Sequence, residues 1–569
     1  MTDRAIGTTR AQSVAGDVRW KPDRMRSYAR PFPSAMFNST MSEINAGEGL
    51  GSGPVHCAEN HDGAYLVWRQ AGVSDRVLVH IDAHHDMYGR WFNKKNPDER
   101  ARITIANFVY AALEEGLVRE VIWVVPDQTW ATSAGRLDVA RELKGLDQGV
   151  GSRKPAIEYE RDHIAGTVLG KRIRVCTAGK IPALQETVLL DIDVDYFIVP
   201  NVGYRGIDVY GSLPWCWPVQ LLDQLQAGGV HTDLTTIAYS VEGGYTPLQW
   251  KYLGDELAQR LKPAPGDLTW TERMRDAAQA TGHGDFDLAE KHYLAAQSLR
   301  PDLAAPCYHL AHLFAATGRP ESGRGYLRQA YKLDPSYRSP FNNAGWWYLE
   351  KKRREQARTG FTRTLLLDPG DAYAHLGRGV LAIEERKWPA AEASLRQALA
   401  LDDCCVEAWR ALGKVLARRR AYAEAIDAYE RSLKLALSGR RALTNPITLS
   451  QGYDWRTPWD PDHGVVLAEL AQLHRAIQAW EKAITDYRLA IAAGGINAAG
   501  AWTRLALLYA RCSCWRDCIN ATCRAVVCVP RALSDWLGRL RVRCREAIES
   551  WREAPAGKHL EPTKPTVWV

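Results

Sequence analysis

Two short acidic segments, each at the end of an apolar run, contain side chains that could bind a metal ion. The candidate ligands are Asp82, His84 and Asp86 in the first segment and Asp191, Asp193 and Asp195 in the second. Carboxylates are rarely buried in a folded protein unless they are paired or bound to a metal. Two such segments at the ends of buried strands therefore predict a shared cation site.

The apolar runs themselves predict the elements that position these side chains. Short apolar runs at Val77–Ile81, Val121–Val125, Val188–Leu190 and Thr236–Tyr239 are typical of buried parallel strands, and a helical pattern at 103–117 separates the first two. Alternating strands and helices predict an α/β domain with a parallel sheet. Ligands of such sheets bind at the carboxyl ends of the strands, where both acidic segments lie. On a strand, residues i and i+2 point the same way, so Asp82, His84 and Asp86 are expected to share one side, as are Asp191, Asp193 and Asp195.

Two further segments contribute polar groups near these strands. Glu59-Asn60-His61 precedes the first acidic segment, and Glu242 follows the last apolar run. Carboxylates with a few imidazoles suit Mn²⁺ or a similar ion better than structural zinc, which favours thiolates. The donors are too many for one small ion, but two ions sharing carboxylates would use them all. Two ions about 3.5–4 Å apart activate water strongly, so hydrolysis is the natural chemistry.

The combined pattern resembles the arginase/agmatinase ureohydrolase superfamily. The matching segments are Asn60-His61, Asp82-Ala-His84-x-Asp86, Asp193-x-Asp195 and Glu242. It is most similar to the peptide arginase branch, through segments such as Leu190–Phe197 and Glu242–Pro247, and the resemblance covers residues 50–260. It implies a three-layer α/β/α fold. It also implies that arginine side chains of a ribosomally synthesised precursor peptide are hydrolysed to ornithine with release of urea.

The resemblance assigns a role to each candidate residue. One Mn²⁺ would be held by His61, Asp82, Asp86 and Asp193, and the second by Asp82, His84, Asp193 and Asp195. Asp82 and Asp193 would bridge the two ions and so act in catalysis. Asp191 would support the ligands from behind, although a register with Asp191 and Asp193 as the ligand pair stays open. Glu242 would bind the planar, permanently charged guanidinium.

The chain departs from the arginase pattern at one point. Arginases carry a proton-shuttling histidine in a Gly-Asn-x-His segment, and the aligned residues here read Ala106-Asn107-Phe108-Val109. His85, a residue from elsewhere or bulk water would then transfer the proton. His80 lies within an apolar run and is interpreted as a core or supporting histidine. The sequence contains no clear counterpart of the contacts that arginases make to the free amino acid, which fits an arginine inside a peptide.

The second half of the chain has a different organisation. Pro301, Pro335 and Pro369 follow similar residues at steps of 34, and Leu401-Asp402 continues the register. This is the tetratricopeptide period, in which helix pairs stack into a concave surface suited to peptides. The predicted parts are a flexible segment 1–35, an arginase-like domain 36–262, a linker 263–270, repeats 271–437, an inserted loop 438–463, further helical repeats 464–553 and a tail 554–569. The repeats are expected to bind the arginine-containing precursor peptide.

Composition limits the other possibilities. The chain has 569 residues, 46% hydrophobic and 24% charged, with a net charge of +7. That charge is too small for this length to indicate nucleic-acid binding. With no long apolar run and no secretory signal at the N-terminus, a cytoplasmic protein without membrane contact is expected. The oligomeric state stays open.

The alternative functions are a ureohydrolase or amidohydrolase acting on a small molecule such as arginine or agmatine, and a non-catalytic repeat scaffold.

Overall fold

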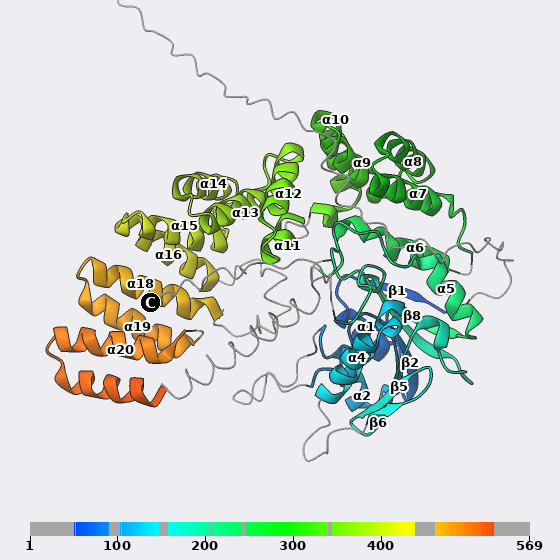
Figure 1. Cartoon of the computed structure of the whole chain (residues 1–569), viewed down its shortest axis with the longest axis horizontal. Helices are drawn as coiled ribbons and strands as arrows, with labels where there is room; N and C mark the ends of the chain where they lie inside the picture. The colour runs from blue at the N-terminus through cyan, green and yellow to red at the C-terminus, as the bar shows by residue number, and fades with distance from the viewer. Residues whose placement is uncertain are drawn as a thin grey trace, which may run out of the picture. The chain divides into compact units, whose positions relative to one another are not determined.

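The structure is a computed structural model that describes residues 50–528. Its gaps are residues 52, 90–102, 104, 147–156, 204–206, 242–244, 263, 339–343, 438–460 and 495. The predicted flexible segment 1–35, the tail 554–569 and most of the inserted loop lie outside the described residues, as does Glu242. Figure 1 shows the chain with the labels used below.

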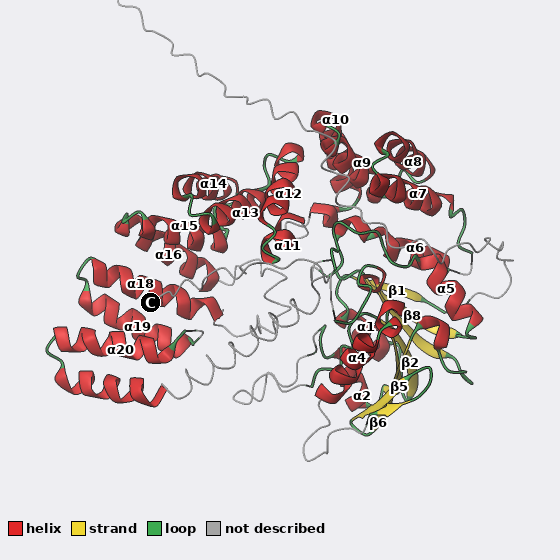
Figure 2. Cartoon of the chain, viewed as in Figure 1, coloured by secondary structure: helices red, strands yellow, loops and turns green. Residues whose placement is uncertain are grey.

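An eight-stranded sheet forms the N-terminal domain (Figure 2). Its strands are β1 (Val55–Ala58), β2 (Arg76–Ile81), β3 (Val118–Val124), β4 (Glu158–Tyr159), β5 (Ile164–Val168), β6 (Lys171–Cys176), β7 (Val188–Asp193) and β8 (Thr232–Ala238). They are ordered β1-β8-β7-β2-β3-β6-β5-β4. Neighbours from β1 to β6 in this order are parallel, whereas β5 pairs antiparallel with β6 and β4.

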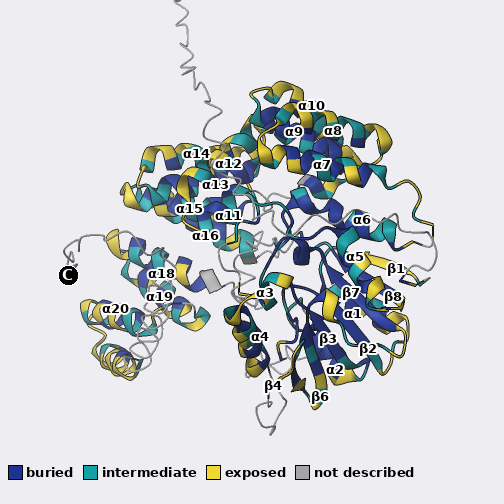
Figure 3. Ribbon diagram, turned by 45° about the vertical axis from the view of Figure 1, so that its right-hand side comes forward, coloured by how far each residue is buried: buried dark blue, intermediate teal, exposed yellow. Residues whose placement is uncertain are grey.

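The sheet is covered by helices on both faces, which explains the continuous apolar runs of its central strands. Alternate residues of β2 enter two different cores: Val77 and Val79 join one, and Leu78 joins the other. Helices α1 (Asp62–Gln70), α2 (Phe108–Glu115) and α4 (Ser133–Gly145) contribute to the second core, and α5 (Pro218–Ala227) and α6 (Tyr252–Arg260) to the first. Strands β2, β3 and β7 are accordingly buried along most of their lengths (Figure 3).

The four strands predicted from the apolar runs are present, but four others were not predicted. Strands β5 and β6 form a hairpin whose turn contains Leu169 and Gly170, both with positive φ. The hairpin extends the sheet with antiparallel strands, so the domain is rich in parallel pairs without being entirely parallel. β6 alternates charged and apolar residues, and β1 has two exposed residues among its four. Neither strand therefore contains the long apolar run on which the prediction relied.

Helical pairs follow the sheet domain. The first block contains α7 (Thr269–His283), α8 (Phe286–Leu299), α9 (Ala304–Ala316), α10 (Pro320–Leu333), α11 (Ala344–Glu350), α12 (Arg354–Leu367), α13 (Ala372–Glu384), α14 (Trp388–Leu401), α15 (Val406–Arg418) and α16 (Tyr422–Leu437). The second contains α18 (Pro461–Ala476), α19 (Trp480–Ala493) and α20 (Ala498–Arg511), followed by a helical stretch at 515–528.

The 34-residue period of the sequence is also a period of backbone conformation. Within successive pairs the first helix is followed by one residue in the left-handed region, at Gly284, Gly318, Lys352, Arg386 and Arg420. These positions are 34 residues apart. The first two are glycines, which adopt positive φ without steric cost, whereas the later three carry side chains. A recurring tight turn therefore sets each pair of antiparallel helices in the same geometry.

The described chain divides into two compact units, one running through Gly377 and one beginning at Arg378. The first unit contains the sheet domain and the first helical pairs because they share a core: Trp270 and Met274 of α7 pack in the same cluster as Ile192 of β7. The linker after α6 is held in place, with Gln259 Nε2 donating to the Pro265 carbonyl at 2.7 Å. In the part of the chain that the structure describes, no helix has the length and apolar character needed to cross a membrane.

A buried histidine of the first unit predicts a stability that depends on pH. His309 Nε2 lies 2.8 Å from the Gln249 carbonyl oxygen, and burial lowers the pKa of this histidine to about 4. The unfolded chain binds the proton near pH 6.5, so stability is complete above that pH and falls as the pH drops toward 4. Between pH 7.5 and 5, we expect a loss on the order of 2 kcal/mol from this group. The measurement is the free energy of unfolding in urea at both pH values.

Two variants isolate this contribution. His309→Gln keeps a donor for the Gln249 carbonyl and cannot titrate, so the loss at pH 5 should shrink. The exposed His283 is the matched control, and His283→Gln should leave the pH dependence unchanged. Equal pH dependence in wild type and His309→Gln would contradict the prediction.

Candidate metal centre

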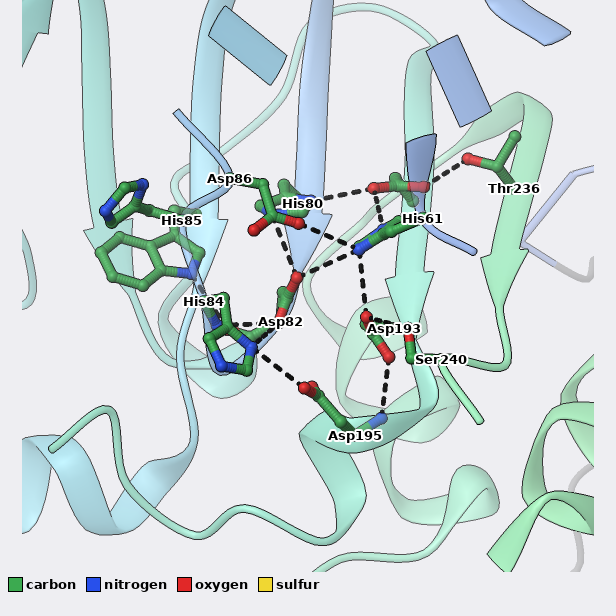
Figure 4. Close-up of polar contacts among 12 residues, drawn as sticks. His61, His80, Asp82, His84, His85, Asp86, Asp193, Asp195, Thr236 and Ser240 are labelled. Carbon is green, nitrogen blue, oxygen red and sulfur yellow. Dashed lines mark hydrogen bonds and ion pairs between the residues drawn. The ribbon is translucent and has the colours of Figure 1, made fainter. Parts of the chain in front are cut away.

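The candidate ligands converge at the carboxyl edge of the sheet. His61 immediately precedes α1, Asp82 follows β2, and Asp193 is the last residue of β7. Asp195 lies in a 3-10 turn, η4 (Val194–Phe197), directly after β7. Because β7 and β2 are adjacent parallel strands, their carboxyl ends bring the two acidic segments together (Figure 4).

One cluster is centred on the Nδ1 atom of His61. This nitrogen lies 3.2 Å from Asp82 Oδ2, 3.2 Å from Asp86 Oδ2 and 3.1 Å from Asp193 Oδ2. Adjacent ligands of an octahedral ion with bonds of about 2.1 Å are separated by about 3 Å. The distances from His61 Nδ1 to the three carboxylate oxygens are therefore those expected between neighbouring ligands of one ion.

A second cluster shares Asp82 with the first. His84 Nδ1 lies 3.2 Å from Asp82 Oδ1 and 3.0 Å from Asp195 Oδ2. The two oxygens of Asp82 thus face different clusters, which is the arrangement of a bridging carboxylate. Asp82 and Asp193 each accept a hydrogen bond from a backbone N–H at Oδ1, but Asp82 Oδ1 also lies beside His84, whereas the described histidine contact of Asp193 is made by Oδ2 with His61. The predicted bridging role of Asp193 therefore stays a prediction.

Several buried atoms that could act as metal ligands in these clusters form no hydrogen bond within the described residues. They are His61 Nδ1, Asp82 Oδ2 and both carboxylate oxygens of Asp195. An unsatisfied buried carboxylate oxygen is strongly unfavourable, and a cation within its reach removes the penalty. The exposed fraction of the Asp82 side chain is 0%, and that of Asp195 is 1%. These residues therefore have the ligand types and the burial that a bound cation requires.

The charges in the site oppose one another. Burial, and then the charges of Asp193 and Asp82, raise the pKa of Asp195 well above its usual value. Burial and the charge of Asp82 likewise raise the pKa of Asp86. Burial disfavours a charge on His61 as well, but the nearby Asp191 and Asp193 raise the pKa of this imidazole well above its usual value. Carboxylates crowded in this way hold positive charge strongly, as a proton or as a metal ion.

Asp191 lies behind the first cluster. Its Oδ2 is 2.8 Å from His61 Nε2 and 2.9 Å from His80 Nδ1, and its Oδ1 accepts a hydrogen bond of 2.5 Å from Thr236 Oγ1. In the tautomer whose Nε2–H donates to Asp191, the unprotonated Nδ1 of His61 would face an ion held by the three carboxylates. A carboxylate that orients a histidine ligand in this way raises its basicity. Burial alone would raise the pKa of Asp191, but His61 and His80 lower it.

The first acidic segment is a turn and not a strand. Strand β2 ends at Ile81, and Asp82 Oδ1 accepts a hydrogen bond of 2.7 Å from the His84 backbone N–H. The Asp82 carbonyl accepts another from Trp123 Nε1 at 3.0 Å, and Asp86 has a φ of 50°. The expectation that alternate residues share a side because of strand geometry was therefore wrong for this segment. The turn brings Asp82, His84 and Asp86 together instead.

Other residues that the sequence singled out lie outside the clusters. His85 is buried, with Nδ1 accepting from the Met87 N–H at 2.9 Å and Nε2 lying 3.5 Å from Glu142. Its ring packs against Trp123 and Tyr88. Figure 4 shows His85 to one side of the clustered carboxylates. Val109 is a residue of α2 and is buried in the core to which this helix contributes. Glu242 lies outside the described residues, so its role stays a prediction.

Some residues of the site were not predicted from the sequence. Ser240 Oγ donates to Asp193 Oδ2 at 2.7 Å, and Phe108 packs its ring 4.7 Å from that of His61. The ring of Tyr245 meets that of His84 edge to face at 5.2 Å. Ser240 and Tyr245 lie on either side of Glu242, which the sequence had singled out. Their closeness to Glu242 in the sequence was therefore the one sign that they could belong to the site. Phe108 belongs to the segment aligned with the arginase pattern, so the same kind of signal was present, but no role was assigned to it.

Comparison with known proteins identifies the helical region only. Tetratricopeptide repeat family models match residues 304–337, 342–402 and 381–438. This part of the chain is thus a tetratricopeptide-type helical solenoid. No curated protein matches the chain.

Solved structures with some likeness to the chain include three proteins. They are MamA (17% identity, 33% of this chain and 96% of MamA covered, TM-score 0.27), PilF of Pseudomonas aeruginosa (16%, 39% and 89%, 0.22) and YrrB, described as a tetratricopeptide repeat protein with an unusual peptide-binding site (18%, 35% and 91%, 0.23). Scores and identities at this level support no conclusion about the function of this chain.

The contacts of Asp191 predict its effect on metal binding. Asp191→Asn removes the negative charge that orients His61, so the affinity for Mn²⁺ should fall by about 10- to 100-fold. Equilibrium dialysis followed by elemental analysis measures the metal bound per chain. Asp233→Asn is the matched control, because Asp233 is half exposed and pairs only with the surface residue Arg76 in the contacts described. Unchanged affinity in Asp191→Asn, with circular dichroism like that of wild type, would exclude the supporting role.

Proposed function

We propose that the N-terminal domain is a dinuclear Mn²⁺-dependent hydrolase that acts on arginine side chains of a precursor peptide. In this reaction, one guanidinium C–N bond is cleaved and one water is consumed, which leaves ornithine in the peptide and releases urea. The helical repeats bind the peptide. The observation that carries the proposal is the Asp82 carboxylate, which is fully buried and directs one oxygen into each of two clusters that contain a histidine and further carboxylates.

The donor set supports manganese chemistry. Two imidazole nitrogens and the oxygens of four carboxylates suit a hard divalent ion, and cysteine is absent from both clusters. When bound, a pair of such ions would activate water for attack and stabilise developing negative charge. In the register that the contacts support, His61, Asp86 and Asp193 would hold one ion, His84 and Asp195 would hold the other, and Asp82 would serve both. Asp191 faces the back of His61 and is not in this set.

The protein groups position the substrate and the ligands. Glu242 would pair with the guanidinium, since a carboxylate can accept two parallel hydrogen bonds from it. Tyr245 and Ser240, on either side of Glu242 in sequence, lie against His84 and Asp193. The residues on either side of Glu242 in sequence thus lie at the two clusters, which supports this role. Asp191 and Thr236 keep the His61 ring fixed throughout the reaction.

The repeats supply the substrate class. Stacked tetratricopeptide pairs provide a long surface for extended or helical peptides. Binding one part of a peptide at the repeats raises the effective concentration of its arginine residues at the metal centre. An enzyme that acts on free arginine does not need a surface that binds peptides. The presence of the repeats beside the metal centre domain therefore favours a peptide substrate over a small molecule.

A non-catalytic scaffold is the second candidate, favoured by the family-model matches to repeats that assemble proteins in many settings. The sheet domain would then have only a structural role. Burial of so many carboxylates argues against it, because such a set is costly to keep in a domain that never binds a cation.

The proposal predicts a mass change in a peptide. With Mn²⁺ and an arginine-containing peptide encoded beside the gene, the full chain should convert arginine to ornithine, seen by mass spectrometry as the loss of one CH₂N₂ unit per site. Asp82→Asn should abolish this loss because both ions would lose a shared ligand. Binding of the peptide to Asp82→Asn should stay within about twofold of wild type, because the repeats are unaltered.

Asp233→Asn serves again as the control and should modify the peptide at the wild-type rate. A chain that binds the peptide and contains no stoichiometric metal supports the scaffold instead. Urea release from free arginine at a higher kcat/KM than from the peptide would support the small-molecule alternative.

A further inference from the structure

A cleft opens at the same edge of the sheet as the metal centre. Its volume is about 320 Å³. The polar and aromatic residues that line it are Asp127, Trp130, Asp162, Thr177, Lys180 and Gln224. None of these residues belongs to the metal clusters, and the proposed reaction uses none of them.

The topology of the sheet places this cleft beside the metal centre. Strands β2, β3 and β6 are adjacent and parallel, so their carboxyl ends lie side by side. Thr177 directly follows β6, and Asp127 begins the short helix α3 (Asp127–Ala131), which follows β3. Neighbouring strands are about 4.8 Å apart, so the end of β6 lies about 10 Å from the end of β2, which leads to Asp82.

A buried tyrosine connects the two sites. Tyr196 directly follows Asp195 in η4, and its buried hydroxyl forms no hydrogen bond within the described residues. Burial raises the pKa of Tyr196 well above its usual value, and Cys216 and Asp127 add to this effect. The Asp127 carboxylate is therefore close enough to act electrostatically on the turn that carries Asp195.

The charges that line the cleft favour a cation. Asp162 Oδ1 lies 3.6 Å from Lys180 Nζ, so these two charges offset each other. The Asp127 carboxylate forms no hydrogen bond or ion pair with a described residue, and partial burial raises its pKa. A cation beside Asp127 would offset the cost of this burial. The indole of Trp130 adds an aromatic surface, which attracts ammonium and guanidinium groups.

We propose that this cleft binds a second basic side chain, lysine or arginine, of the peptide whose modified arginine lies at the metal centre. The inference rests on the proposed function and adds a sequence preference to it. An extended peptide spans about 3.3 Å per residue, so a separation of about 10 Å corresponds to roughly three residues. The preferred substrate therefore carries a basic residue about three positions from the modified arginine.

The test compares two capped, fluorescently labelled peptides. One is Lys-Gly-Gly-Arg-Gly-Gly-Lys, and the other has glutamine in place of both lysines. Lysine on both sides allows for either direction of binding, and the proposed reaction leaves lysine unchanged. Affinity for the Mn²⁺-loaded full chain is measured by fluorescence anisotropy before detectable urea has formed. At low salt, wild type should bind the lysine peptide about three- to fivefold more tightly, and the ratio should approach one at about 0.5 M salt.

Variants of the cleft assign this preference to its residues. Asp127→Asn should bring the ratio close to one, and Asp127→Lys should favour a third peptide that has glutamate in place of both lysines. Trp130→Leu should lower the ratio about twofold, whereas Trp130→Phe keeps an aromatic ring and should match wild type. Asp233→Asn is the matched control, because Asp233 lies near the amino end of β8, at the opposite edge of the sheet. Manganese content and circular dichroism should be unchanged in all of these variants.

The outcomes separate this inference from the proposed reaction. Equal affinity of wild type for the lysine and glutamine peptides, or binding of neither, overturns the inference, as does an Asp127→Asn variant that keeps the wild-type ratio. If urea is released from both peptides at the same kcat/KM, the reaction stands and the cleft has no such role. If wild type releases no urea but prefers the lysine peptide, and Asp127→Asn loses this preference, the reaction fails and the cleft stands.

Discussion

The structure of the N-terminal domain is governed by the concentration of carboxylates at one edge of its sheet. Asp82, Asp191 and Asp195 are almost wholly buried, and Asp86 and Asp193 are nearly so. The repulsion between these carboxylates must be offset by cationic groups. The protein groups that contact them and can carry a positive charge are imidazoles. The five carboxylates therefore fall into two groups by the direction of their pKa shifts. Histidines lower the pKa of Asp82 and Asp191 against the effect of burial, whereas the pKa values of Asp86 and Asp195 are raised. A set of this kind is satisfied only when additional positive charge lies between its members.

The order of the strands explains how these groups meet. β7 lies between β2 and β8, so one central strand carries Asp191 and Asp193, while β2 leads to Asp82 and β8 leads to Ser240. β1, at the edge next to β8, delivers His61 at the start of α1. All four strands are parallel and share a carboxyl edge, yet they come from two parts of the chain, 55–81 and 188–238, that are more than a hundred residues apart. Right-handed crossovers through helices on both faces are what such an arrangement requires.

Local patterns predicted the central strands, the 34-residue helical period and the gathering of the acidic segments, because each depends on a few neighbouring residues. The parts that were missed depend on tertiary contacts. β1 and β6 have no continuous apolar run, and the fold of the Asp82–Asp86 turn depends on Trp123 from the next strand. Periodicity could not separate Asp191 from Asp193, since both point to the same side of β7. The partners His80 and Thr236 distinguish them, and no spacing in the sequence reveals a partner.

The first helical pairs are continuous with the domain that carries the metal centre, and this bears on how a tethered peptide could be used. Two segments that leave the centre end in contacts with these helices. The chain after Tyr196 leads to Asp208, which accepts a hydrogen bond of 3.0 Å from Tyr348 Oη. The chain after Tyr245 leads to Gln249 and Lys251, whose partners are His309 and Asp334. A shared core beneath these contacts makes them part of one body. A peptide held on the helices of this unit would therefore be held at a fixed distance from the clusters, which is the condition under which tethering raises effective concentration most.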